Sequence, residues 1–141
     1  MLGDFAKVDV VKAYPSTPIR EVARLMAERR VGLVVLVEPG NPHRVVGVVS
    51  ERDIVRAVAQ GVSLEEPCEV IATKNVVALD YRESVAKAAE AFRRYGIRHV
   101  VVTREGRLYG VLSIRDILRE DSALREIASY YDWTFEPGMS A

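Results

Sequence analysis

A short motif that joins a serine to an aspartate occurs twice in the chain, and its side chains could bind a polar ligand. One copy, GVVSERDI, contains Ser50 and Asp53, and the other, GVLSIRDI, contains Ser113 and Asp116. Six of the eight positions are identical, and the copies are 63 residues apart. A serine followed three residues later by an acid is typical of a helix start, so we expect each motif where a strand leads into a helix.

Two interpretations of this motif remain open. In a capping box the serine and the aspartate satisfy the free N–H groups of the helix start, and no ligand is needed. Alternatively, the partial positive charge of the helix N-terminus attracts an anion, while the aspartate accepts hydrogen bonds from a diol such as a ribose. The residue pattern by itself favours the cap.

Residues typical of catalytic and metal sites are scarce. Cys68 is the single cysteine, and His43 and His99 are the only histidines. We therefore expect no disulfide and no metal site, and we expect Cys68 to be a small buried apolar residue. The sequence contains no Gly-x-Ser-x-Gly, no phosphate-binding loop and no Gly-x-Gly-x-x-Gly, so we expect no catalytic residues and no enzyme activity.

The helices and strands that position the motifs are predicted by the pattern of apolar residues, which occurs twice along the chain. In the first half, Thr17 followed by Pro18 predicts a capped helix start. The predicted elements of this half are strands at 10–11, 31–37 and 45–50, a turn at 38–42, and helices at 18–26 and 51–60. Those of the second half are strands at 76–79, 100–102 and 108–113, and helices at 85–92 and after residue 113.

The two halves align closely, which predicts the fold class. Met26 aligns with Phe92 at a spacing of 66 residues, and the spacing falls to 63 after a proline-containing loop that is longer in the first half. We predict an α+β fold of two β-α-β-β-α repeats packed with approximate twofold symmetry. Because about 55 residues form only a marginal core alone, the repeats should bury apolar faces against each other. The predicted boundaries are 1–61, 62–120 and a C-terminal helix with an aromatic tail at 121–141.

The composition is that of an ordinary folded domain. The chain has 141 residues, of which 49% are hydrophobic and 28% charged, and its 20 basic and 20 acidic residues cancel. A nucleic-acid-binding protein usually has a basic excess, so we expect no nucleic-acid partner. No apolar run is long enough to span a membrane and the first residues do not form a signal peptide, so we expect a cytoplasmic protein without a membrane partner.

Two halves of this order, each ending in Gly-x-x-Ser-x-x-Asp, resemble the cystathionine β-synthase (CBS) domain pair, or Bateman module, in its stand-alone prokaryotic form. The resemblance covers approximately residues 7–119. Members of this family bind adenosine-containing ligands: AMP, ADP, ATP or S-adenosylmethionine. The resemblance implies that Asp53 and Asp116 hold ribose hydroxyls with the help of Ser50 and Ser113, in two clefts between the repeats.

The resemblance also implies which residues share each cleft, because family clefts combine the aspartate of one repeat with contacts from the other. Arg98 and His99 look like a basic pair that contacts phosphate in the family. Gly32 and Leu33 stand at the matching positions of the first repeat, so the two clefts should differ. The cleft of Asp53 is expected to contain Thr73, Asn75, Val76, Arg98, His99 and Arg115. The cleft of Asp116 is expected to contain Val8, Asp9, Val10 and Arg52.

Ordinary structural roles remain open for the polar members of these sets. Arg98 and His99 can be a solvated arginine and a hydrogen-bonded histidine at a strand edge. Arg52 and Arg115 can form surface ion pairs, which contribute about 0–1 kcal/mol. Thr73 can cap a turn.

The expected function is a regulatory module that binds an adenine nucleotide, AMP first and ADP or ATP next, and acts as an energy or metabolite sensor for a partner protein. One alternative is a structural dimerisation module with non-functional clefts. Another is a module for S-adenosylmethionine, although its cationic sulfonium is a poor match for Arg98 and His99. We expect a homodimer. Four apolar helix residues are expected either to form the contact between the two copies, called the seam here, or to belong to the internal core. They are Val22, Met26, Ala88 and Phe92. The C-terminal aromatics are expected to seal the core or that seam, or to bind a partner protein.

Overall fold

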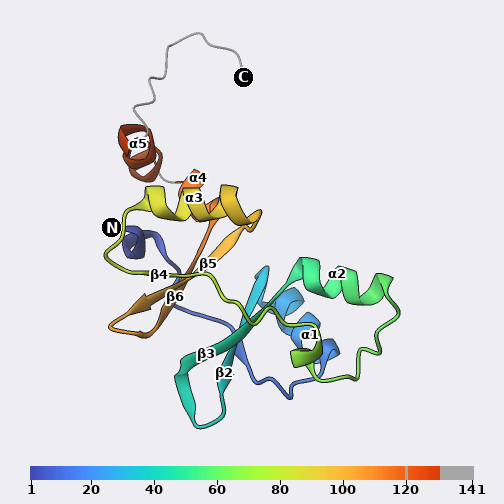
Figure 1. Cartoon of the computed structure of the whole chain (residues 1–141). Coiled ribbons are helices and arrows are strands. Elements are labelled where there is room, and N and C mark those ends of the chain that lie inside the picture. Colours follow the sequence, from blue (N-terminus) through green and yellow to red (C-terminus); the bar gives the residue numbers. More distant parts are fainter. Residues whose placement is uncertain (120, 131–141) are drawn as a thin grey trace.

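The computed structural model describes residues 1–119 and 121–130 and consists of two similar halves, each with one three-stranded sheet (Figure 1). The first half contains η1 (Leu2–Phe5), β1 (Lys12–Ala13), α1 (Ile19–Arg29), β2 (Leu33–Glu38), β3 (Asn41–Ser50) and α2 (Glu51–Ala59). The second contains η2 (Cys68–Val70), β4 (Ala78–Asp80), α3 (Val85–Tyr95), β5 (His99–Arg104), β6 (Arg107–Ser113) and α4 (Ile114–Leu118), and α5 (Asp121–Tyr130) follows. This order confirms the predicted α+β repeat.

Both sheets have the same topology. Their strand orders are β1-β2-β3 and β4-β5-β6, with a parallel pair followed by an antiparallel hairpin. Leu33 lies opposite Ser50 in one hairpin, and His99 lies opposite Ser113 in the other. The first residue of each central strand is therefore beside the serine that begins the motif helix.

The first residues of each repeat pair with the other repeat. Lys7 and Val111 exchange two backbone hydrogen bonds of 2.9 and 3.0 Å. At the equivalent place in the first half, Thr73 and Val48 exchange bonds of 2.9 and 3.0 Å. Each repeat thus lends a segment to the last strand of its neighbour, which joins the two halves into one body.

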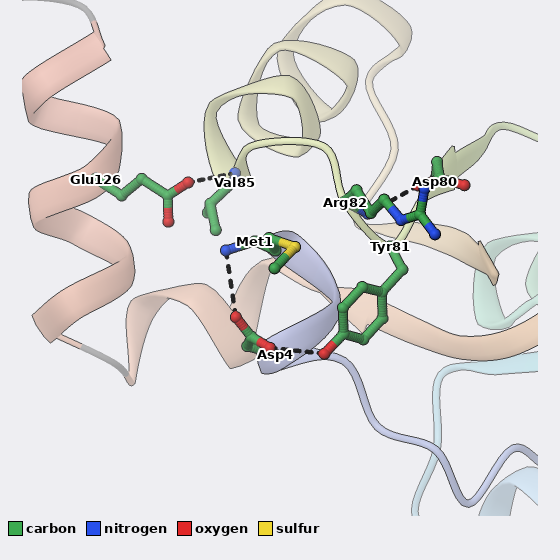
Figure 2. Close-up of polar contacts among 7 residues, drawn as sticks. All are labelled: Met1, Asp4, Asp80, Tyr81, Arg82, Val85 and Glu126. Carbon is green, nitrogen blue, oxygen red and sulfur yellow. Dashed lines mark hydrogen bonds and ion pairs between the residues drawn. The ribbon is translucent and has the colours of Figure 1, made fainter.

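The exchange extends into the cores. Leu2 and Cys68, which are equivalent positions 66 residues apart, are both fully buried, each in the core of the opposite repeat. In the short helix η1, which contains Leu2, Asp4 accepts a hydrogen bond of 2.8 Å from the Tyr81 hydroxyl of the second repeat (Figure 2). Leu2 and Cys68 therefore stabilise the neighbouring repeat rather than their own.

A third core lies between the two sheets. Its buried members are Leu33, Val35 and Val37 of β2 together with Val101 of β5. Val10 and Val76 pack against this core. They were predicted in edge strands at 10–11 and 76–79, but those strands begin two residues later, at Lys12 and Ala78, because pairing with the central strands starts only there.

Two further details differ from the sequence prediction. Thr17 does not cap α1, since its hydroxyl oxygen instead accepts a hydrogen bond from the Tyr14 N–H at 3.0 Å. The backbone N–H groups of Ile19 and Arg20 donate to carbonyls of the connecting segment, at Glu66 and Leu64. Distant backbone therefore replaces the expected side-chain cap.

The turn predicted at 38–42 is also shorter than expected. It is confined to Pro39 and Gly40, because β3 already begins at Asn41. Gly40 has a φ of 85°, a left-handed conformation that glycine adopts without strain.

The residues considered for a dimer seam are inside the molecule. Val22 and Met26 lie in the core of the first repeat, and Ala88 and Phe92 in that of the second. Their role as a seam is therefore wrong, and the internal-core alternative is confirmed. The aromatic residues Tyr131, Trp133 and Phe135 lie outside the described residues.

The helix α5 covers only the second repeat. It lies against α3 and α4 (Figure 1), and its Ala123 and Ile127 join the second core. The Glu126 carboxylate accepts a hydrogen bond of 3.1 Å from the Val85 N–H at the start of α3 (Figure 2). The α1–α2 face of the first repeat has no equivalent cover among residues 1–119 and 121–130.

Cys68 is expected to resist thiol reagents in the native protein. Its side chain is fully buried and its Sγ lies 3.2 Å from the Tyr14 carbonyl oxygen, and burial raises the pKa of the thiol to about 11. Because the folded-state pKa lies above the ordinary value, the protonated thiol favours the folded state below about pH 9 and this contribution is lost toward about pH 11. A disulfide-exchange dye at mildly alkaline pH should label the urea-unfolded chain and not the folded one. Rapid labelling of the folded protein would contradict the burial.

Candidate functional site

The two motif serines form the capping boxes that the sequence predicted. In the first motif the Asp53 Oδ2 accepts hydrogen bonds from the Ser50 N–H at 2.8 Å and the Ser50 hydroxyl at 3.0 Å, and the Asp53 N–H donates back to Ser50 Oγ. In the second motif the Asp116 Oδ2 accepts from the Ser113 N–H at 2.9 Å, and the Asp116 N–H donates to Ser113 Oγ. The cap fixes the orientation of each carboxylate at the start of its helix.

The cap uses only one oxygen of each carboxylate. The Asp53 Oδ1 lies 3.9 Å from an Arg56 nitrogen, and the Asp116 Oδ1 lies 3.7 Å from the Lys7 Nζ. Neither oxygen has a hydrogen-bond donor within bonding distance among the residues that the structure describes. Both aspartates are also nearly inaccessible, with exposed side-chain fractions of 11% and 9%. The capping interpretation is therefore compatible with a ligand that donates to Oδ1.

A small pocket of about 390 Å³ lies beside Asp116. Its other lining residues are Asp4, Phe5, Lys7 and Arg119. Two cations, two carboxylates and one aromatic ring thus line this pocket, so the cations can pair with an anionic group of a ligand while the ring contacts an apolar one. The Tyr81 hydroxyl lowers the pKa of Asp4 below its ordinary value by hydrogen bonding to it.

The four residues expected to share the cleft of Asp116 do not line this pocket. Val8 is exposed and Val10 packs in the core between the sheets. Asp9 pairs with Arg29 at 3.1 Å. Arg52 donates a hydrogen bond of 3.3 Å to the carbonyl oxygen of Gly96.

The repeat itself carried the signal that points to Lys7. At a spacing of 66 residues, Lys7 is the equivalent of Thr73, which was expected beside Asp53. The same reasoning applied to the second motif would have selected Lys7, whose backbone pairs with β6 next to the motif.

The structure separates the residues that were expected to share the cleft of Asp53. Thr73 is exposed and lies against β3, the strand that ends in Ser50. Asn75 and Val76 follow it and line a large groove that the motif aspartates do not reach. Arg115 is exposed on the first turn of α4, next to Asp116 in sequence.

His99 lies where the two repeats meet. A methyl group added to Gly32 would lie only 3.1 Å from the His99 Cε1 and 3.2 Å from a Glu51 carboxylate oxygen. Equivalent backbone hydrogen bonds lie here in the two repeats. The Glu51 N–H donates to the Gly32 carbonyl in the first repeat, and the Ile114 N–H donates to the Arg98 carbonyl in the second. The imidazole is therefore between the starts of α2 and α4, and a side chain at position 32 would require it or Glu51 to shift by a few tenths of an ångström.

His99 is expected to titrate below the ordinary histidine range. Burial lowers its pKa, and Arg115 and Arg98 lower it further, against the raising effect of Glu51 and Asp116. Because the folded-state pKa is depressed, the neutral imidazole favours folding above the ordinary value of 6.5, and this contribution is lost as the pH falls through the folded-state pKa. An NMR titration of the ring protons should give a midpoint below 6.5 in the folded protein and near 6.5 in urea. A folded-state midpoint at or above the unfolded one would contradict this environment.

Residues 1–119 and 121–130 contain no group of three or more histidine, cysteine or acidic side chains that could hold a metal ion. None of the described helices is long and apolar enough to cross a membrane.

Comparison with known proteins connects this site to a family. The CBS domain model matches residues 2–60 and again residues 68–123. The structure of a CBS domain protein from Pyrobaculum aerophilum, PAE2072, complexed with AMP, is similar to this chain with a TM-score of 0.86 and 46% identity. The match covers 91% of this chain and 98% of that one.

Two further relatives are more distant. The CBS domain pair of protein MJ0100, in complex with 5′-methylthioadenosine and S-adenosyl-L-methionine, has a TM-score of 0.76 and 25% identity, over 84% of this chain and 97% of that one. A 17.7 kDa protein of Acidianus ambivalens is 39% identical over 80% of this chain and 66% of its own length. The chain spans 66%, 63% and 41% of the length of three curated relatives that it matches.

Proposed function

The chain belongs to the CBS-domain family and carries two copies of the domain, and from this premise we propose that it is a regulatory module that binds an adenine nucleotide. AMP is the first candidate and ADP or ATP the next. In this proposal the module has no catalytic step. It senses the nucleotide and passes the signal to a protein partner.

One observation carries the proposal. Each motif holds an oriented, nearly buried carboxylate whose Oδ1 has no hydrogen-bond donor among the described residues. A ribose provides hydroxyl donors for such an oxygen, whereas a purely structural cap would leave it unused. The 46% identical relative complexed with AMP supports the choice of ligand.

The cations near the motifs support a phosphate-bearing ligand. Arg98 is exposed and makes no ion pair with any described residue. Lys7 and Arg119 line the pocket at Asp116. A nucleotide phosphate would pair with such groups, whereas the cationic sulfonium of S-adenosylmethionine would be repelled.

Binding between the repeats also suggests how a signal could arise. The clefts are built from segments that cross from one repeat to the other, so a ligand would favour the conformers in which the two halves are closest. A partner protein that prefers those conformers would then respond to the nucleotide.

Thermal unfolding with AMP, ADP, ATP and S-adenosylmethionine tests the proposal. A ligand present at 100 times its Kd stabilises the folded state by about 2.7 kcal/mol. We expect AMP to raise the melting temperature most. No change with any ligand at millimolar concentration would contradict the proposal and favour a structural module, and a response to S-adenosylmethionine alone would favour that ligand.

We further propose that the protein is a homodimer that uses the uncovered face of the first repeat. Val55 and Val58 on α2 are 67% and 60% exposed. These two valines lie one turn apart on the helix. The residue of the second repeat that is equivalent to Val55, at a spacing of 63, is Leu118. A second copy would remove these side chains from water.

Val55→Lys is expected to weaken the dimer, because it puts a charge into the face that dimerisation would bury. Gln60→Lys is the matched control, since it adds the same charge on the same exposed helix end outside the Val55–Val58 stripe. Size-exclusion chromatography with light scattering should show a smaller mass for Val55→Lys and an unchanged mass for the control. Equal masses for both variants, or a monomeric wild type, would contradict this surface.

A further inference from the structure

A larger groove, of about 1490 Å³, lies away from both motif aspartates. Its walls are the start of β3 in the first hairpin, the segment at residues 74–79, one side of α3 and the turn of the second hairpin. The start of β3 is the end opposite to Ser50, so the groove reaches the far side of the sheet from the motif. It is larger than the approximately 300–1,000 Å³ of a small-molecule pocket.

The charges that line this groove are strongly unequal. Five lysine or arginine side chains from four different segments line it, namely Arg44, Lys74, Lys87, Arg94 and Arg107. Glu90 is the single carboxylate in the lining. In a chain with no net charge, this gathering marks one surface as distinctly basic.

Most of these cations lack an acidic partner. Arg44 pairs with Glu38 at 3.3 Å. Lys74, Lys87 and Arg107 make no ion pair with any residue in the described part of the chain, and the Arg94 guanidinium lies over the Tyr95 ring, 5.5 Å from its centre. Unpaired like charges in one groove repel each other, and an anionic occupant would relieve that repulsion.

The spacing of the cations along α3 suits an extended chain. Lys87 and Arg94 lie two helical turns apart on α3, which corresponds to about 10 Å. An extended peptide covers that distance with three to four residues, at about 3.3 Å per residue. Partly buried apolar side chains, including Val45 and Leu108, lie between the charged walls, and they can pack against the stem of each bound side chain.

A nucleic acid matches the groove less well. Single strands are held by stacking of bases on aromatic side chains in addition to charge. Tyr95 is the one aromatic residue other than His43 in the lining, and the Arg94 guanidinium already lies against it.

We propose that this groove binds an extended acidic segment of a partner protein. Acidic side chains placed along the segment would pair with Lys74, Lys87, Arg94 and Arg107, which have no carboxylate partner among the residues that the structure describes. No nucleotide takes part in this interaction, so its test is independent of the proposed ligand.

The test is fluorescence anisotropy with a labelled hexaglutamate peptide at low ionic strength, and with a labelled hexauridylate for comparison. Lys87→Glu/Arg94→Glu reverses two groove charges on α3. Arg82→Glu/Arg93→Glu is the matched control, because it changes the net charge equally at exposed positions outside the groove. Circular dichroism on both variants verifies that they are folded.

We expect the groove variant to bind hexaglutamate at least tenfold more weakly than the wild type, and the control to bind within about twofold of it. Equal weakening in both variants would show attraction by net charge alone and would overturn the proposal. No binding of hexaglutamate to the wild type at millimolar concentration, or tighter binding of hexauridylate than of hexaglutamate, would overturn it as well.

Discussion

Asp53→Ala is expected to lower the affinity for AMP by a factor of ten to a hundred or more. The change removes the carboxylate proposed to accept hydrogen bonds from the ribose, and a hydrogen bond to a charged group contributes about 1.5–3 kcal/mol, which is roughly a tenfold to hundredfold change in Kd. Isothermal titration calorimetry of AMP into wild type and variant measures this directly. An unchanged Kd would contradict the assignment of Asp53 to the ribose.

Asp116→Ala is the matched control, since it removes the equivalent carboxylate from the equivalent capping box. We expect it to weaken AMP binding less than Asp53→Ala does, because the cleft of Asp53 is the one assigned to Arg98 and His99. Each variant keeps its N-cap serine but loses the N3 half of the capping box, which destabilises both by about 1 kcal/mol, so titrations are done well below both melting temperatures. If Asp116→Ala weakens AMP binding more than Asp53→Ala does, Arg98 and His99 belong to the cleft of Asp116 instead. The charge of Asp116 does act on His99, whose pKa it raises.

Gly110→Ala is expected to destabilise the fold strongly. A Cβ at this position would lie 2.6 Å from the Lys7 carbonyl oxygen, so the backbone of Lys7 has to move away. Lys7 exchanges two backbone hydrogen bonds with Val111, and these would be lost or lengthened. We expect about 2–3 kcal/mol of lost stability from overpacking and broken bonds, measured as the free energy of unfolding in urea.

Gly47→Ala is the control for this change. Gly47 is the equivalent position of the first repeat, and its added Cβ would lie 3.3 Å from the Thr73 carbonyl oxygen. We expect it to cost less than about 1 kcal/mol, since a shift of a few tenths of an ångström relieves it. The two changes have the same effect on the unfolded chain, so their difference reports the native contact. Equal stabilities would contradict the close pairing of Lys7 with β6.

The fold was largely predictable because its main determinants are local and repeated. The alternation of apolar residues located the helices and strands, and the Ser-x-x-Asp spacing located both capping boxes. The errors have a common origin. Thr17 looked like a helix cap, but the carbonyls of Glu66 and Leu64 occupy that role. No local pattern shows which distant backbone group will arrive at a helix start.

The site was predictable where a side chain and its function share one motif, as Ser50 and Asp53 do. It was less predictable where a residue acts on the other repeat. For Lys7 the one sequence signal is its equivalence to Thr73, because its neighbours in sequence give no sign that it pairs with β6 beside Asp116. The basic groove was missed, because its cations come from segments that only the folded chain brings together.

A crystal structure of the protein grown with millimolar AMP would show directly where the nucleotide binds. We expect AMP between the repeats, with a ribose hydroxyl within hydrogen-bond distance of the Asp53 Oδ1 and the phosphate beside Arg98 or His99. AMP bound away from both motif aspartates, or both clefts empty at that concentration, would contradict this expectation.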